Sequence, residues 1–531
     1  MPSRRVDVVV VGAGFAGLYM LKRLRDHGWN VRVLEAGGGV GGTWYWNRYP
    51  GARCDVPSIE YSYSFDRDLE QEWDWTERYA TQPEILSYLE HVAERFDLYR
   101  DIQFETRVES AAFDEDTKTW NITTSDGAQT TARFVVFATG CLSTANTPDI
   151  PGLEEFGGEV YHTGRWPHEG VDFTGKRVAV IGTGSSGIQS IPVIAEQADQ
   201  LTVFQRTANY SVPANNYVLD EEYKAEIKAE YPKLRAENRA TPVGFGARGR
   251  PPAGNALETP ADQLIAELEA RWELGGLGFL GGFMDAFTNK EANDLVASFV
   301  KEKIAARVDD PEVAEALMPD TVIGCKRLCV DTGYFETFNR DNVRLVNLRK
   351  TPIDSITERG VKTTGESFEF DAIVLATGFD AMTGTLMRID ITGRDGLTLK
   401  EAWAEGPKTY LGLGVPGFPN MFIITGPGSP SVLTNMVTSI EQHVEWITDC
   451  VDHMRDNGVQ TIEAKPEDAD QWVQYVNAIT GFTLFTTCNS WYLGANIPGK
   501  PRVFMPLFGF NTYTDGCAGV AADGYRGFAL A

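Results

Sequence analysis

Positive charge is scarce in this 531-residue sequence. Lysine and arginine total 48 residues against 74 aspartate and glutamate residues, which gives a formal net charge of −26 at pH 7. Nucleic-acid binding needs clustered positive charge, so this balance argues against a nucleic-acid partner. Any phosphate group that the protein binds must therefore be held by local backbone N–H groups and a few arginines.

Long apolar runs are absent as well. No stretch approaches the ~20 apolar residues of a membrane-spanning helix. Residues 1–5 lead straight into a strand-like run, without the apolar segment of a signal peptide. We therefore expect no membrane partner and a place in the cytoplasm.

Cysteine is also rare. The seven cysteines are an odd number and form no C-x-x-C motif, so a disulfide framework is not predicted. Cys325 and Cys329 are four residues apart and could face each other on a helix, although such cysteines are most often small apolar residues. We predict no redox motif and no metal site.

Two glycine-rich motifs about 170 residues apart are the most informative feature that is present. Residues 8–17 read VVVVGAGFAG and residues 178–187 read VAVIGTGSSG. Each motif follows an apolar run and precedes a helical pattern, which is the context of a dinucleotide-binding fingerprint. Its glycines make the tight turn, admit the pyrophosphate and let helix pack on strand. The predicted nucleotide contacts are Gly12, Gly14 and Gly17 in the first motif and Thr183, Gly184, Ser185, Ser186 and Gly187 in the second.

The residue that ends the next apolar run has opposite charge in the two motifs. Glu35 lies 21 residues after Gly14, and Arg206 lies 22 residues after Gly184. A carboxylate at this position accepts hydrogen bonds from ribose hydroxyls and repels a 2′-phosphate, whereas an arginine attracts one. The first site should therefore take FAD or NAD and the second NADP. The alternative is that Arg206 is only a solvated charge at the end of a strand.

The chain organisation predicts an α/β fold. It consists of two Rossmann-like dinucleotide-binding domains, as in two-dinucleotide-binding flavoproteins, with an inserted helical lobe. Two apolar runs, at 134–140 and 372–378, both end in Ala-Thr-Gly and indicate the last strand of each half. We assign residues 1–145 and 385–531 to a discontinuous FAD-binding domain, 153–215 and 325–380 to an NADP-binding domain, 216–324 to the helical insertion, and 146–152 and 381–384 to linkers.

A third motif lies between the two fingerprints. Residues 156–167, FGGEVYHTGRWP, fit F-x-G-x-x-x-H-x-x-x-W-P, the signature of type I Baeyer–Villiger monooxygenases. Residues 41–55 and 489–500 also resemble that family, and the resemblance extends over nearly the whole chain. The signature residues are Phe156, Gly158, His162, Trp166 and Pro167. Histidine is often a general base, but the place of His162 just before the second domain favours a hinge near the linker.

The resemblance implies FAD in the first site and NADPH in the second, and NADP⁺ is expected to stay bound after the flavin has been reduced. It implies that one atom of O₂ is inserted beside a ketone carbonyl, through a C4a-peroxyflavin, to give an ester or lactone. The partners would be O₂ and a small-molecule ketone, aryl-substituted or cyclic, and no protein partner is implied. Sulfide oxidation is expected as a side activity.

The resemblance also implies roles for individual residues. Arg327 matches the active-site arginine of the family, whose fixed charge would keep the peroxide deprotonated in a pocket with little water. Asp55 would orient that guanidinium. From the residues alone, Arg327 could equally be a surface charge, and Asp55 could cap a turn.

The remaining residue assignments complete the predicted site. Further FAD contacts are Gly42, Thr43, Trp44, Tyr61 and Val108, with Asp55 beside them. Further NADP contacts are Gln189, Thr207, Lys326, Arg327 and Trp491, of which Trp491 would lie on a mobile loop. The predicted substrate pocket holds Ser431, Val432, Leu433, Met505 and Leu507, although the stretch around Met505 departs from the family pattern.

Rival functions share parts of this pattern. A flavin N- or S-hydroxylating monooxygenase has both fingerprints, but Trp166-Pro167 favours the Baeyer–Villiger branch. A pyridine-nucleotide disulfide reductase needs a redox cysteine pair near the flavin, and only Cys54 lies in that region. A non-catalytic nucleotide-sensing flavoprotein would keep the fingerprints with no need for Asp55 and Arg327.

Overall fold

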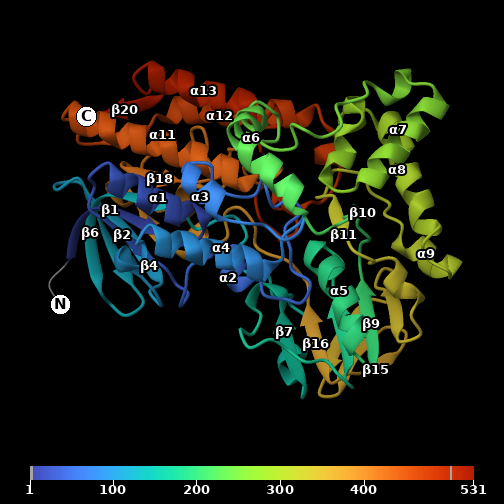
Figure 1. Ribbon diagram of the computed structural model, residues 1–531. Helices are drawn as coiled ribbons and strands as arrows, with labels where there is room; N and C mark the ends of the chain where they lie inside the picture. The colour runs from blue at the N-terminus through green and yellow to red at the C-terminus, as the bar shows by residue number, and fades with distance from the viewer. Residues whose placement is uncertain (1–3, 503–504) are drawn as a thin grey trace.

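Two main β-sheets, each flanked by helices, make up the framework of the protein (Figure 1). The computed structural model describes residues 4–502 and 505–531. The chain builds most of the first sheet, passes to the second, and returns to the first near residue 390. This arrangement confirms the predicted α/β fold with two Rossmann-like units. In the described ranges, no helix is long and apolar enough to cross a membrane.

The first sheet joins the two ends of the chain. Its parallel part runs β18-β6-β1-β2-β3, and β5, β4 and β17 continue from the other half of β6. Strands β17 and β18 come from the C-terminal part of the chain, whereas the other six strands precede residue 140. The strands are β1 (Arg4–Val11), β2 (Val31–Leu34), β3 (Ile102–Gln103), β4 (Val108–Asp114), β5 (Thr119–Thr124), β6 (Gln129–Phe137), β17 (Asp390–Thr392) and β18 (Met421–Ile423).

Buried clusters lie on both faces of the first sheet at strand β1. Residues 8–11 of strand β1 are apolar without alternation because both faces of the sheet are buried there, as in other parallel sheets, whereas Arg5 and Asp7 before them are exposed. Helix α1 packs against β1 and carries α11 on its outer side (Figure 1). The helices of this part are α1 (Phe15–Asp26), α2 (Thr43–Trp46), α3 (Arg67–Glu72), α4 (Gln82–Arg95), α10 (Leu399–Ala402), α11 (Met436–Asp456), α12 (Pro466–Gly481) and α13 (Phe510–Ala522).

The second sheet is fully parallel and has the order β12-β9-β8-β16-β7. Helix α5 (Ser185–Gln197) follows β8 in the same way that α1 follows β1. The strands are β7 (Glu159–His162), β8 (Arg177–Ile181), β9 (Gln200–Gln205), β12 (Val343–Asn347) and β16 (Ala372–Leu375). Two strand pairs are formed by β10 (Ser211–Pro213) with β11 (Cys329–Asp331) and by β19 (Ile462–Ala464) with β20 (Phe528–Leu530). A three-stranded sheet has the order β13 (Ile353–Thr357), β14 (Gly360–Thr363) and β15 (Ser367–Glu369), with β14 in the middle.

The segment 216–324 is mainly helical, as predicted, but it does not pack as one lobe. Helix α6 (Glu221–Arg239) lies against the first domain, where Arg235 Nε donates to Glu70 Oε1 of α3 over 2.8 Å. Helices α7 (Ala261–Leu274), α8 (Lys290–Ala305) and α9 (Pro311–Leu317) instead share a buried cluster with the second sheet (Figure 1). Helical periodicity identifies an apolar stripe, but it does not say which core that stripe meets.

One disulfide corrects the expectation from cysteine spacing. Cys325 is bonded to Cys488, with Cα atoms 6.2 Å apart and a sequence separation of 163. Cys329, the neighbour that spacing suggests, begins strand β11 and is a free buried thiol. Sequence spacing reveals local pairs, whereas this bond depends on how distant segments meet.

Candidate functional site

A cavity of about 1960 Å³ lies where the two nucleotide-binding motifs face each other. Gly12 and Gly14 of the first motif and Gly182 and Gly184 of the second all line it. Both turns lie at the carboxyl ends of parallel strands, which is where α/β sheets bind their ligands. The cavity therefore has two nucleotide-facing ends and one shared middle.

The glycines at the first end keep the backbone open to a large ligand. Gly12 has φ +107°, and a Cβ on it would lie 2.6 Å from the carbonyl oxygen of Ala138. Gly42 approaches Gly14 so closely that its Cβ would lie 2.9 Å from the Cα of Gly14. No side chain caps α1 at Gly14, so its first N–H groups are available to an anion.

The third glycine of each motif has a packing role. A Cβ on Gly17 would overlap the carbonyl oxygen of Gly12, and one on Gly187 would overlap that of Gly182. Neither Gly17 nor Gly187 is among the described residues that line the cavity. Their absence of a side chain lets helix approach strand, as the motif requires.

Glu35 marks the first end of the cavity. The carboxylate is buried, and it accepts hydrogen bonds from the N–H groups of Ala13 and Gly37, each over 2.7 Å. Burial raises the pKa of Glu35, and these two N–H groups partly oppose that rise. Two bonds leave acceptor capacity on the carboxylate for hydroxyl groups of a ligand.

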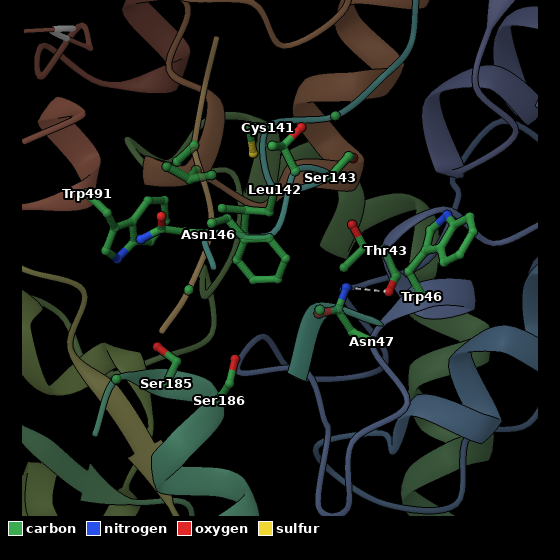
Figure 2. A pocket seen from close by; sticks show the side chains of 18 of the residues that line it. Thr43, Trp46, Asn47, Cys141, Leu142, Ser143, Asn146, Ser185, Ser186 and Trp491 are labelled. Atoms are coloured by element: carbon green, nitrogen blue, oxygen red, sulfur yellow. Dashed lines mark hydrogen bonds between the residues drawn. The ribbon is translucent and has the colours of Figure 1, made fainter. Parts of the chain in front are cut away.

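The other predicted contacts at this end also line the cavity. They are Gly42, Thr43, Trp44, Asp55, Tyr61 and Val108. Trp44 Nε1 donates to the hydroxyl of Tyr61 over 3.3 Å. Figure 2 shows Thr43 and Trp46 on one side of the cavity and Trp491 on the other, with Ser185 and Ser186 on a third side.

Three cations gather at the second end of the cavity. Arg206 and Lys326 were predicted here, and Arg349 joins them in the lining. Burial lowers the pKa of Lys326, and Arg206 and Arg349 lower it further, while Asp320 opposes them. Arg349 is also ion-paired with Asp320, and cations that gather at one end of a cavity favour an anion there. The predicted contacts Thr183, Gly184, Ser185, Ser186, Gln189 and Thr207 line the same end.

Gln189 also joins the two nucleotide domains. Its Nε2 donates to the carbonyl oxygen of Arg53 over 3.0 Å, and its Oε1 accepts from the hydroxyl of Tyr49 over 2.8 Å. This amide therefore holds the first helix turn of α5 against the segment that leads to Asp55.

Arg327 lies in the shared middle of the cavity and is paired with Asp55. Nε of Arg327 donates to Asp55 Oδ2 over 2.9 Å, and Nη1 donates to the carbonyl oxygen of Val432 over 3.3 Å. The side chain of Tyr492 also interacts electrostatically with the guanidinium. Burial by itself would lower the pKa of Arg327, but Asp55 and Tyr492 outweigh it and raise that pKa. The guanidinium is a fixed positive charge at any pH.

The segment that carries Trp491 forms one wall of the cavity. Cys488, Asn489, Trp491 and Asn496 are among its lining residues. Asn496 Nδ2 donates to the carbonyl oxygen of Phe379 over 2.9 Å, which ties the segment to the end of the second sheet. The wall therefore spans both nucleotide domains.

Comparisons with known proteins agree with this arrangement. Residues 9–241 match the family model described as pyridine nucleotide-disulphide oxidoreductase. Over 526 residues the chain is 43% identical to a Baeyer-Villiger monooxygenase of Pseudooceanicola batsensis, covering 98% of this chain and 95% of the relative. The chain belongs to the Baeyer–Villiger monooxygenase family.

Solved structures with the same fold extend the comparison. An oxidized steroid monooxygenase bound to NADP is 56% identical, with a TM-score of 0.95 and 99% of each chain covered. A complex of OTEMO with FAD and NADP is 41% identical, with a TM-score of 0.96 and 100% of each chain covered. The OTEMO complex holds both FAD and NADP, in agreement with the two nucleotide-binding motifs that line this cavity.

The five defining residues of the Baeyer–Villiger signature lie beside the cavity, although two residues between them line it. His162 Nδ1 accepts from the N–H of Gly164 over 2.9 Å, and Nε2 lies 3.2 Å from the carbonyl oxygen of Asn146 in the linker. Phe156 and Trp166 are buried in clusters of the second domain, and a Cβ on Gly158 would press on the carbonyl oxygen of Asp371. Phe156, Gly158, His162, Trp166 and Pro167 are not among the described lining residues, whereas Gly164 and Arg165 are.

The predicted substrate pocket is only partly on the cavity wall. Val432 lines the cavity, but Ser431, Leu433, Met505 and Leu507 are not among the described residues that do. Met505 is buried behind the wall, in one cluster with Val432 and Tyr492. The short 3₁₀ segment Ser431–Leu433 points successive side chains in different directions, so one residue of the three reaches the cavity.

Sequence reasoning missed other residues of this Baeyer–Villiger cavity. The wall next to Val432 also contains Thr434, which lies just before α11, and Met436 and Ile440 from the start of that helix. Arg349 follows strand β12, which is the neighbour of β9 in the sheet. A cation just after a parallel strand is a sequence signal for a phosphate-binding residue. Only the strand order shows that Arg206, after β9, and Arg349, after β12, lie at the same edge of the second sheet.

Proposed function

We propose that this chain is an NADPH- and O₂-dependent flavin monooxygenase that inserts one oxygen atom next to a ketone carbonyl, giving an ester or lactone. The observation that carries this proposal is the Arg327–Asp55 pair in a cavity that both nucleotide motifs share. A guanidinium held there lies between the two nucleotide-binding motifs, where it could act on groups bound at either end of the cavity. Family membership supports the same reaction.

The first end of the cavity fits FAD. Its crowded glycines leave room for a pyrophosphate only because they lack side chains, and Glu35 supplies a carboxylate at the ribose position. The carboxylate disfavours a 2′-phosphate. Gly12, Gly14, Gly42, Thr43 and Glu35 would hold the cofactor.

The second end of the cavity fits NADPH. Arg206, Lys326 and Arg349 supply positive charge beside Thr207, where a 2′-phosphate needs it. The backbone turn at Gly184 and the start of α5 would take the pyrophosphate. The three cations explain how a chain of strongly negative net charge can still select a phosphorylated nucleotide.

When bound, the two nucleotides supply hydride transfer and the activation of O₂. The chain's own residues position the reacting groups and stabilise charge. Arg327 offers its remaining N–H donors to oxygen atoms that become negative as oxygen is transferred, and Asp55 fixes the direction of these donors. Both side chains are partly buried, with exposures of 23% for Arg327 and 15% for Asp55, and a bound ketone that displaces water from the cavity would strengthen this interaction.

A small-molecule ketone would occupy the wall beside Arg327. Val432, Met436 and Ile440 give this wall an apolar surface, and the carbonyl group would point toward the guanidinium. We also propose sulfide oxygenation as a side activity, because a sulfur lone pair can accept the same oxygen atom.

Product identity tests this function directly. Purified holoprotein is first mixed with NADPH without air, and bleaching of the flavin absorbance is expected. Air is then admitted with a panel of aryl, cyclic and linear ketones, an amine and a sulfide, and the products are identified by mass spectrometry. Esters or lactones support the proposal, whereas hydrogen peroxide as the sole product throughout would refute it. A flavin that NADPH does not bleach would indicate a sensor instead.

A further inference from the structure

The disulfide between Cys325 and Cys488 joins two segments that matter for the proposed site. Cys325 is two residues before Arg327 and adjoins Lys326, and Cys488 is three residues before Trp491. Cys488 lies in the cavity wall, while Cys325 is buried behind it. The bond therefore fastens the segment of Trp491 to the segment of the active-site guanidinium.

The far end of the same wall segment is fastened by polar contacts. Lys500 Nζ donates to Asp380 Oδ1 and to the carbonyl oxygen of Ala381, each over 2.5 Å. Asn496 adds its bond to Phe379. Residues 488–500 thus form a strap across the cavity with a covalent attachment at one end and an ion pair at the other.

Two side chains of this strap act inside the cavity. Trp491 lines it, and Tyr492 is buried in the cluster that contains Val432 and interacts electrostatically with the guanidinium of Arg327. Anything that loosens the strap at Cys488 also loosens these contacts. The redox state of the cysteine pair is therefore coupled to the geometry around Arg327.

The remaining cysteines are poor targets for oxidation by comparison. Cys54, Cys141, Cys329, Cys450 and Cys517 are buried free thiols. Burial raises the pKa of Cys54 and Cys329 to about 12 and that of Cys141 to about 11. Since the thiolate is the reactive form, these groups are protected.

We propose that Cys325 and Cys488 are a reversible oxidation site, set by peroxide and reset by dithiols, that holds or releases the strap of residues 488–500. The effect on turnover rests on the proposed function, but the oxidation site itself does not. The bonded form holds Trp491 and Tyr492 against the cavity. The dithiol form frees the near end of the strap and exposes the cavity to solvent.

The chemistry uses hydrogen peroxide, the product of O₂ reduction without oxygen transfer. The Cys488 thiol, which reaches the cavity, attacks one peroxide oxygen, so the O–O bond breaks and a sulfenic acid and one water form. The Cys325 thiol then attacks that sulfur, forms the S–S bond and releases a second water. Two thiols lose two electrons and two protons, and the peroxide takes them up. A dithiol reverses the bond by exchange.

The first test follows the bond and the strap without any turnover. Holoprotein is treated with dithiothreitol or with hydrogen peroxide, mapped as non-reduced peptides, and digested briefly with a protease. We expect a linked peptide of Cys325 and Cys488 only after peroxide, and cleavage within 488–500 several-fold faster in the reduced protein. Absence of the linked peptide, or equal cleavage in both states, would overturn the proposal.

Matched variants separate the pair from other thiols. Cys488→Ser and Cys325→Ser should be cleaved quickly in both states, while Cys450→Ala, which removes a buried thiol of α11, should keep the full response. A response that survives Cys488→Ser would place the effect elsewhere and end the proposal. If a serine variant does not fold, the wild-type comparison still decides.

Turnover provides the last readout. In the reduced protein we expect a several-fold higher KM for NADPH and less ester per NADPH consumed than in the oxidised protein. Ester formation that does not depend on the redox state, with state-dependent cleavage, would limit the pair to a structural latch and refute the coupling. State-dependent cleavage in a protein that forms no ester under any condition would instead refute the proposed function alone.

Discussion

Arg327 and Asp55 form a hydrogen-bonded ion pair over 2.9 Å although 272 residues separate them in the sequence. Asp55 comes from the segment after the first nucleotide motif, and Arg327 precedes strand β11 of the second domain. The pair therefore spans the two domains. Its geometry depends on both domains being folded and docked.

Loss of the guanidinium should separate the two half-reactions. In Arg327→Ala, reduction of the flavin by NADPH should persist, while ester formation should fall by at least about 100-fold, because removing one such charge-stabilising donor costs roughly 3 kcal/mol. Stopped-flow absorbance follows the first step and product analysis the second. Arg340→Ala, at an exposed arginine, serves as the control. Retained ester yield in Arg327→Ala would remove this residue from the chemistry.

The 2′-phosphate assignment makes a prediction about cofactor choice. Arg206→Ala should raise the KM for NADPH by about 10- to 100-fold, the loss expected of a charge-assisted hydrogen bond. The KM for NADH should change little. Arg349→Ala should also raise the KM for NADPH, because Arg349 adds positive charge at the same end of the cavity. Equal losses for NADPH and NADH in Arg206→Ala would contradict the assignment.

The hydroxyl of Tyr492 should matter for oxygen transfer. Tyr492→Phe keeps the ring in its buried cluster and removes only the contact with Arg327, so we expect about a 3- to 10-fold loss of ester formation, as for one hydrogen bond. Flavin reduction should stay at the wild-type rate. Tyr475→Phe, on the exposed side of α12, is the control. An unchanged ester rate in Tyr492→Phe would show that Asp55 alone positions the guanidinium.

Asp331 should make stability depend on pH. Burial raises the pKa of Asp331 to about 6, and Ser211, which donates to its Oδ2 over 2.6 Å, partly opposes that rise. The folded chain therefore keeps a proton that the unfolded chain releases between about pH 4 and 6, so this group's contribution to stability falls as the pH rises through that window. Asp331→Asn should remove this component.

Denaturation at two pH values measures that effect. The change in unfolding free energy between pH 4 and pH 7 is compared for the wild type and Asp331→Asn. The difference between the two proteins isolates Asp331 from the other carboxylates. An identical pH dependence in both would mean that Asp331 is already ionised when buried.

Features that are local in the backbone could be assigned from the order of the amino acids. Each glycine motif is a strand, a turn and a helix within about ten residues, so Gly12 and Gly182 could be assigned to turns without any knowledge of the rest. The same holds for the apolar strands and for the offsets of Glu35 and Arg206. The identity of Asp55 and Arg327 as candidates required family resemblance, because nothing local marks them.

The way in which distant segments meet could be learned only from the folded chain. The fold brought Arg349 beside Arg206, bonded Cys325 to Cys488, and divided the predicted helical lobe between two cores. It also chose Val432 over Ser431 and Leu433 for the cavity wall. Hydrophobic periodicity indicates which face of a helix or strand is buried. Because the hydrophobic effect is not directional, it does not specify the element against which that face packs, and this partner is set only when the whole chain folds.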